Sequence, residues 1–293
     1  MIAALFIALA VLTLAYIAIW VFEVRKNPDT PDAAVPNAER VVVGFFANFF
    51  DALGIGSFAT TTTYFRLRKL VRDELIPGTL NVGHCLPTIT QAFIGIAVIA
   101  VDPVTLILMI AAAVAGAWVG ADVVSRMPRR AIQVGMGVAL LVAAGFMLAK
   151  LTALMPSSDA GTLNLAGWRL AGGLVGSFFL GAIMPLGIGY YAPCMVLVSL
   201  LGMNPRASFP IMMGACAFLM PVASAQFVRK KRYSLRAASG LAAGGIFGSA
   251  LALLVVKEMN LRTVMWLVVV VVVYTALSLL RSAATERRAA AAV

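Results

Sequence analysis

The chain has 293 residues, of which 62% are hydrophobic and 12% are charged, and its mean hydropathy is +0.97. A soluble domain carries about twice that share of charged residues, so the composition excludes an ordinary soluble domain and predicts an integral membrane protein. The net charge is +11, but Lys and Arg cluster in short loops between apolar stretches, which is typical of topology determinants and not of nucleic-acid binding.

The first apolar stretch, residues 1–23, has neither a basic start nor a small-residue cleavage site. We therefore expect a retained transmembrane helix there and not a cleaved signal peptide. Residues 24–39, which contain NPDTPDAAVPN, are expected to form an exposed cytoplasmic connector. The three cysteines lie in apolar segments without CxxC or metal-ligand spacing, so we expect buried thiols and neither a disulfide framework nor a metal site.

Two longer stretches, 41–70 and 170–202, are each interrupted by a glycine pair. FDALGIGSF contains Gly54 and Gly56, and MPLGIGYYA, which follows after about 133 residues, contains Gly187 and Gly189. Each half is shorter than a full crossing, so we expect two hairpins of short helices that enter the membrane and return to the same side; full crossing by each short helix is the alternative. Backbone groups freed by such breaks are tolerated at membrane depth only where they line a cavity or contact a ligand, so paired breaks predict a transporter site at mid-membrane.

At the first break, Ser57 and Thr60 fall in the first turn of the helix after Gly56. The free amides and positive dipole end of a helix N-terminus suit an anion, so these residues are expected to bind substrate. Asp51 lies in the apolar segment FFANFFDALGIG, and a carboxylate within the membrane is a functional candidate by default. We expect Asp51 to carry a coupled proton or, with Asn48, to ligate a sodium ion; a helix cap or an interfacial ion pair is the structural alternative.

Three spans are predicted after the first hairpin, at about 75–101, 104–125 and 130–151. In the first of them Asn81 and His84, the only histidine, share one helical face, which Gln91 continues. Polar residues on a membrane helix usually face the bundle interior, so we expect Asn81 and His84 to line a cavity, with ordinary packing as the alternative. The imidazole would also suit proton coupling. Gln226 is the approximate counterpart of Gln91 in the second half, and either residue could contact substrate or hydrogen-bond between helices.

At the second break, Gly187, Gly189 and Tyr190 are expected to contact the anion from the other side, while Met184 takes the position of Asp51. Spans follow at about 206–228, 235–256 and 262–281. A further echo joins the halves, because glycines spaced four apart occur in VAGAWVGAD (116 and 120) and in AAGGIFGSA (244 and 248). This spacing predicts close helix packing.

The positions of Lys and Arg predict the topology. With both hairpins re-entrant, all 23 basic residues except five fall on one face, which the positive-inside rule assigns to the cytoplasm. The exceptions are Lys150, Arg169, Arg206, Lys257 and Arg262. The N-terminus is then outside and the C-terminus inside. Because the first half crosses the membrane an odd number of times, the second half starts on the opposite side, and the two repeats are inverted.

The predicted organisation follows in chain order. It comprises an N-terminal transmembrane helix (1–23), a cytoplasmic connector (24–39), transport repeat 1 (40–152), an extracytoplasmic connector (153–167), transport repeat 2 (168–282) and a cytoplasmic tail (283–293). The fold class is all-α: a polytopic membrane protein with an N-terminal span and two inverted-topology repeats, each built from a broken hairpin and three spans.

The chain resembles the sulfite exporter TauE/SafE family, also called the toluene sulfonate uptake permease family. The resemblance lies in the segment Gly44–Gly56, the basic loop after it, the IPGTLN stretch Ile76–Asn81 and a weaker second copy at Gly176–Gly189. It implies a two-halved transporter of sulfite, sulfonates or other small organosulfur anions in the bacterial inner membrane. Family members often carry a richer glycine run, whereas this chain has four threonines (60–63) after the first break and two tyrosines (190–191) after the second.

The expected function is secondary transport of a small organosulfur anion, such as sulfite or sulfoacetate, by alternating access with ion coupling. An anion channel, or a transporter of another small carboxylate or inorganic anion, is the alternative. We expect no enzyme activity, since one histidine and scattered hydroxyls form no triad or metal-ligand set. No cofactor is expected beyond a coupled proton or sodium ion. The expected partners are the anion and membrane lipids, with a homodimer left open.

Overall fold

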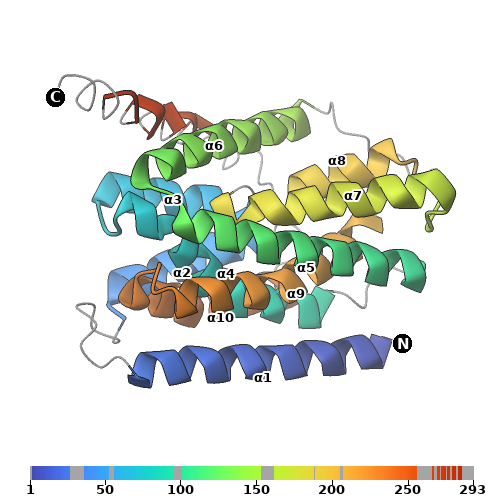
Figure 1. Cartoon of the computed structure of the whole chain (residues 1–293), viewed down its shortest axis with the longest axis horizontal. Coiled ribbons are helices and arrows are strands. Elements are labelled where there is room, and N and C mark those ends of the chain that lie inside the picture. The colour runs from blue at the N-terminus through green and yellow to red at the C-terminus, as the bar shows by residue number, and fades with distance from the viewer. Residues whose placement is uncertain are drawn as a thin grey trace.

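The computed structural model describes residues 2–26, 36–52, 56–95, 101–152, 162–187, 189–204 and 207–255, with single residues and short stretches between 266 and 285. The named elements of this part are helical, which confirms the predicted class. In chain order they are α1 (Ile2–Lys26), α2 (Ala38–Ala52), α3 (Ser57–Arg68), η1 (Asp73–Leu75), α4 (Ile76–Gly95), α5 (Pro103–Arg126), α6 (Arg129–Leu151), α7 (Gly167–Ile183), η3 (Met184–Leu186), α8 (Tyr191–Leu200), α9 (Ser208–Arg229) and α10 (Leu235–Val255). They form one bundle, with α1 along one side (Figure 1).

Six of the described helices are long and apolar enough to cross a membrane, which makes this a multi-pass membrane protein. They are α1, α5, α6, α7 extended by η3, α9 and α10. Five of them match predicted spans; the predicted span 262–281 lies partly outside the described residues.

Two elements differ from the predicted pattern. α4 forms in the predicted span 75–101, but it is not among the six apolar candidates, because it carries a series of polar side chains. It is buried between other helices along most of its length. α7 with η3 covers 20 residues, enough for a crossing of about 30 Å, although both arms of the second hairpin were expected to be shorter than a span.

Both broken stretches form hairpins whose outer ends meet. In the first, Arg68 Nε near the end of α3 lies 3.1 Å from Glu39 Oε1 near the start of α2, and the Tyr64 hydroxyl donates to the same oxygen at 2.9 Å. In the second, Thr162 before α7 pairs with the chain after α8: its amide donates to Gly202 O (3.3 Å) and its carbonyl accepts from Asn204 N (3.0 Å). The two joined ends lie at opposite ends of the bundle (Figure 1).

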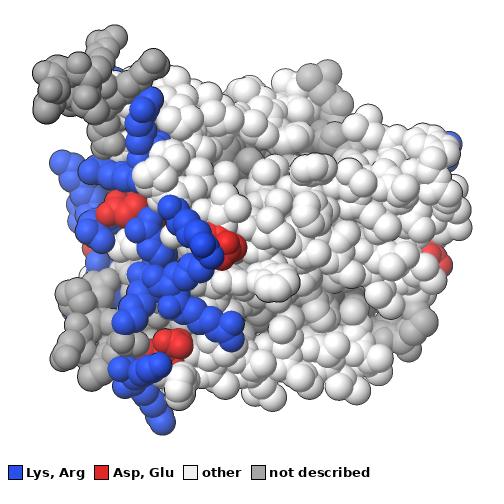
Figure 2. All heavy atoms as spheres, viewed as in Figure 1, with Lys and Arg blue, Asp and Glu red and all other residues white. Residues whose placement is uncertain are grey.

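Basic side chains gather at one end of the molecule, as the loop pattern predicts (Figure 2). The last turns of α1, α3, α5 and α9 all carry Lys or Arg. A buried carboxylate helps to organise this end: Asp73 in η1 lies beside Arg66, accepts from Gln133 Nε2 at 3.0 Å and is 3.6 Å from Arg129. The segment after the first hairpin is thereby joined to α6.

The echoed glycines make equivalent close approaches in the two halves. On α5, Cβ atoms at Gly116 and Gly120 would overlap the carbonyl oxygens of Phe178 and Ala182 on α7. On α10, Cβ atoms at 244 and 248 would overlap carbonyl oxygens of α2, at 41 and 45. The first arm of each hairpin therefore packs, backbone against backbone, on a helix of the other half, while α4 and α9 pack against each other between them.

The start of α5, just outside the membrane-spanning segment, is capped by the side chain of Asp102. Asp102 Oδ2 accepts from Thr105 N and from Thr105 Oγ1, each at 2.9 Å. These bonds, the backbone one foremost, hold the pKa of the Asp102 carboxyl below its ordinary value. The stabilisation is complete above the ordinary pKa of an aspartate and is lost as the pH falls through the lowered pKa of the folded state.

We expect Asp102→Ala to lower the melting temperature by a few degrees at neutral pH, because the first turn of α5 loses its cap. Thermal unfolding in detergent between neutral and strongly acidic pH measures this. The difference between the variant and the unmodified protein should shrink in acid, and a difference that stays constant down to the lowest pH would contradict the assignment.

Candidate functional site

α4 contacts the breaks of both hairpins. Toward the first, His84 lies 3.1 Å from Thr61 Oγ1 of α3, and its ring centroid lies 5.6 Å from that of Phe58. Toward the second, Asn81 Nδ2 donates to Pro185 O in η3 at 3.3 Å, and a Cβ at Gly187 would lie 3.9 Å from Leu80 Cδ1. Residues beside both breaks therefore contact the buried polar face predicted for α4.

At the first break, the start of α3 is capped by a carboxylate from α2. Gly56 precedes α3 with φ +92°, a conformation that favours glycine, and it offers no side chain to cap the helix. Asp51 Oδ1 accepts instead from Ser57 N at 2.7 Å. The helix cap that the sequence left as one alternative for Asp51 is thus formed, and an amide expected to face the substrate is bound by the protein's own anion.

The second oxygen of Asp51 extends the network to α4 and α10. Gln91 Nε2 lies 2.9 Å from Asp51 Oδ2 and 3.1 Å from Ser249 Oγ. All three side chains are buried. The carboxylate is held by a backbone amide and a side-chain amide, so four helices meet at one polar cluster that contains a single ionisable carboxyl group.

His84 is held between Asn48 and Thr61. Asn48 Nδ2 donates to Gly44 O at 2.8 Å, which leaves Asn48 Oδ1 facing His84 Nδ1 at 3.1 Å. His84 Nδ1 must therefore carry a hydrogen, and in a neutral ring Nε2 accepts from the Thr61 hydroxyl. The ring is buried and both nitrogens are engaged, so this arrangement fits a neutral imidazole that orients α2 and α3 around α4.

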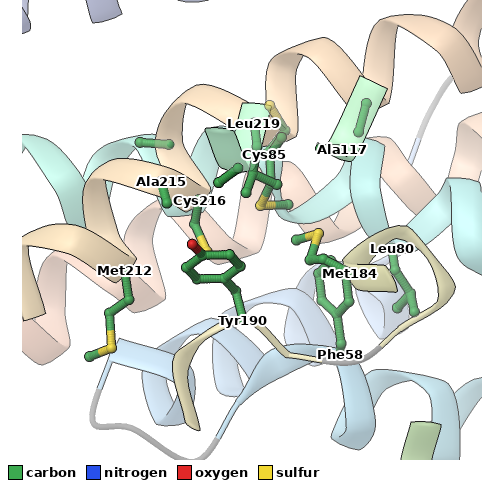
Figure 3. Packing of buried hydrophobic residues seen from close by; sticks show 14 of the residues in the cluster. Phe58, Leu80, Cys85, Ala117, Met184, Tyr190, Met212, Ala215, Cys216 and Leu219 are labelled. Atoms are coloured by element: carbon green, nitrogen blue, oxygen red, sulfur yellow. The ribbon is translucent and has the colours of Figure 1, made fainter. Parts of the chain in front are cut away.

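At the second break, Gly187 has φ +106° and follows η3 directly. Tyr190 follows Gly189 directly; it is buried, and its hydroxyl has no hydrogen-bond partner within the described residues. Figure 3 shows this hydroxyl directed toward Cys216 of α9, with Phe58, Leu80 and Met184 in the same packed cluster. The residues that follow the first break and precede the second thus belong to one buried core.

Not all predicted site residues come together. Gln226 lies in the last turn of α9, about 15 Å further along that helix than Cys216, and therefore apart from the cluster around Tyr190. Thr60 Oγ1 donates to Ser57 O and Gly56 O at the start of α3 and, among the described residues, to no other helix. Asn48 and Asp51 have different partners, since Asn48 Oδ1 lies beside His84 and Asp51 Oδ1 accepts from Ser57 N. Gly54 lies outside the described residues.

A sequence model described as Sulfite exporter TauE/SafE matches residues 2–147, the N-terminal half with α1 and the first hairpin. The chain belongs to this family. TauE/SafE proteins are transporters and not enzymes, so the protein is a transmembrane transporter. No curated protein and no solved structure matches the chain. The match confirms the resemblance drawn from the first break and includes α1, which the sequence pattern had left outside it.

The departures of this TauE/SafE chain from the glycine-rich pattern are part of the buried network. Of the four threonines after the first break, Thr61 bonds His84, while the hydroxyls of Thr62 and Thr63 are buried without a partner among the described residues. The tyrosine at 190 fills the space after the second break. Polar and bulky groups therefore stand where many family members carry glycine.

Several residues of the cluster were not singled out from the sequence. Thr61 was read only as one of four threonines, and Ser249 and Phe58 carried no signal at all. One available signal was the position of Ser249 beside Gly248 on α10, since a hydroxyl in an apolar run usually has a partner across the interface. Which partner it has follows only from the fold.

Two pockets of the transporter lie beside the first hairpin. One, of about 440 Å³, is mainly apolar and lies between α2 and α3, from Glu39 and Tyr64 to Phe50, Thr60 and Thr61. Thr61, which lines this pocket, is also the hydrogen-bond partner of His84. The other, of about 700 Å³, is at the basic end; its lining includes Arg66, Lys69, Arg72, Asp73 and Arg129. Within the described part of the chain, no group of three or more His, Cys, Asp or Glu residues could hold a metal ion.

Proposed function

We propose that this TauE/SafE transporter moves a small organosulfur anion, sulfite or a sulfonate such as sulfoacetate, by alternating access. The substrate binds between the two broken hairpins, and transport is coupled to an ion. The observation that carries the proposal is the shared contact of both breaks with α4, at Thr61–His84 on one side and Asn81–Pro185 on the other. A substrate held there would be released to either face by movement of the hairpins relative to α4.

Two inverted halves would provide the two equivalent conformations that such a cycle needs. The closure of the hairpins at opposite ends, by Glu39–Arg68 and by the pairing of Thr162, supports this arrangement. So does the exchange of partners, in which α2 packs on α10 and α7 packs on α5.

The groups near the breaks suit an anion that is bound without a buried cation. They are backbone amides at helix starts, the amide side chains of Asn81 and Gln91, and the hydroxyls of Thr61 and Tyr190. Neutral donors of this kind avoid the cost of a bare Lys or Arg at the bilayer centre. The basic end is assigned to the cytoplasm, with the N-terminus outside and the C-terminus inside the bacterial inner membrane.

Binding to the purified protein in detergent tests the substrate class. Thermal unfolding is followed with sulfite, thiosulfate, sulfoacetate, taurine, isethionate, sulfate and chloride, at two pH values and with or without sodium. A ligand of the folded state present at 100 times its Kd stabilises by about 2.7 kcal/mol, which raises the melting temperature by several degrees. We expect one sulfur anion to produce this shift and chloride to produce none.

Counterflow in vesicles separates a carrier from an anion channel. Uptake of the labelled anion should accelerate when the same unlabelled anion is present inside, because the return step of a carrier is faster when loaded. Uptake that does not saturate and does not respond to internal anion would favour the channel. Stabilisation only by sulfate or chloride would move the substrate outside the class of sulfite and the sulfonates.

A further inference from the structure

We propose that Asp51 is a tethered competitor for the transported anion, so that each anion enters together with one proton on Asp51. This inference rests on the proposed function and specifies its coupling ion. Its basis is that the start of α3, which the glycine break opens toward the site, is capped by the carboxylate from six residues earlier.

The hydrogen-bond donors around Asp51 are of the kind, and at the distances, that would bind an anion. Oδ1 accepts from Ser57 N at 2.7 Å, and Oδ2 accepts from Gln91 Nε2 at 2.9 Å. A sulfonate or sulfite oxygen would need the same donors, a helix-start amide and neutral hydrogen-bonding side chains. The negative charge already there is therefore the charge with which a substrate has to compete.

The surroundings leave the charge of Asp51 uncompensated. α3 contributes Ser57 and α10 contributes Ser249. Among the titratable side chains of the other packed helices, His84 of α4 is engaged by Asn48 and Thr61, and Cys216 of α9 interacts electrostatically with Asp51. Among the described Lys and Arg residues, none is paired with Asp51. A second anion beside an ionised Asp51 would meet unscreened repulsion in a medium of low dielectric constant.

Protonation removes this conflict. A proton from solution adds to a carboxylate oxygen of Asp51, which then carries no charge and gives up the Ser57 amide. The substrate anion accepts that amide, and the pair of anion and proton is neutral for a monovalent substrate. When the anion leaves, the proton returns to solution and the carboxylate caps α3 again. The second half has no such group, because the buried Met184 takes the corresponding position, so one proton accompanies each anion.

The sharpest test is the pH dependence of isethionate binding, since its sulfonate stays ionised over the accessible pH range. Isothermal titration measures Kd for the unmodified protein, for Asp51→Asn, and for Asp102→Asn as a matched control, because Asp102 also caps a helix start but lies outside the site. We expect Kd of the unmodified protein and of the control to rise about tenfold per pH unit above the pKa of Asp51. Asp51→Asn should bind with a pH-independent Kd close to the low-pH value of the unmodified protein.

A pH dependence of Kd that persists in Asp51→Asn overturns the competition and leaves the proposed function standing. A change in Kd that depends on sodium and is absent from Asp51→Asn has the same consequence. If isethionate and the other sulfur anions bind to no form, the substrate class is wrong. Nitrate, which also stays ionised, then tests the competition alone, through the same slope and its loss in Asp51→Asn; absence of nitrate binding at every pH overturns it.

If Asp51→Asn does not fold, proton uptake by the unmodified protein decides. In weakly buffered solution, at a pH where Kd of the unmodified protein rises about tenfold per pH unit, about one proton should be taken up per isethionate bound. Binding without proton uptake overturns the proposal.

Discussion

Gly116→Ala and Gly244→Ala are expected to destabilise the bundle severely. A Cβ at 116 would overlap the carbonyl oxygen of Phe178, and a Cβ at 244 would overlap that of Val41. In both places the obstacle is backbone inside a packed helix pair, which cannot rotate away as a side chain can. Separating α5 from α7, or α10 from α2, should cost about 3 kcal/mol or more for a single methyl group.

The matched control is Gly145→Ala on α6, where a Cβ would meet nothing within 4 Å. This substitution should be neutral or stabilise the helix by up to about 1 kcal/mol, because alanine has the higher helix propensity. Size-exclusion profiles and thermal unfolding of the three variants in detergent measure the difference. Unfolding temperatures of the 116 and 244 variants as high as that of the Gly145 variant would show that the helices do not pack as described.

The sequence predicted that these helices make close backbone contacts, but not with which partner helices. Glycines four apart in an apolar helix predict that another backbone approaches, and the repeat of the pattern at 244 and 248 indicated that both halves use it. What the pattern could not supply is the partner, since α5 packs on α7 and α10 on α2, each across the two halves of the chain. Partner choice depends on shape over whole helices and not on spacing within one of them.

Apolar length predicted most spans, and the elements that differ from the expected pattern are α4 and α7. α4 is surrounded by protein and therefore tolerates Thr79, Asn81, His84 and Gln91 on one helix. α7 with η3 reaches a length that can cross a membrane, because the helix begins at Gly167, before the predicted start at 170, and continues through Met184 and Pro185 up to the break.

The sequence predicted which residues belong to the candidate site better than it predicted what each of them does there. The face shared by Asn81, His84 and Gln91 follows from helical periodicity, and the structure does bury these side chains. The sequence assigned the start of α3 to the substrate, whereas Asp51 occupies it, because the turn at Gly56 brings the end of α2 back over the first amide of α3. A contact across a turn of this kind depends on backbone angles that a list of residues does not contain.

The two glycines of the second break are expected to respond differently to the same substitution. Gly187 has φ +106°, and a Cβ there would find ordinary contact distances, 3.7 Å to Met136 Cε and 3.9 Å to Leu80 Cδ1. The cost of Gly187→Ala is therefore conformational, about 1–2 kcal/mol for an L-residue held in this region. Because the turn also fixes Pro185 against Asn81, transport should fall together with stability.

Gly189→Ala provides the comparison within the same motif. A Cβ at Gly189 meets nothing within 4 Å, so stability should stay unchanged or rise slightly. The open space is where a substrate held between the hairpins could approach the backbone, so a raised KM at unchanged melting temperature would place the anion beside Gly189. Melting temperatures and initial uptake rates of the two variants separate these effects. Equal stability of Gly187→Ala and the unmodified protein would contradict the left-handed turn, and with it the geometry that brings the second break against α4.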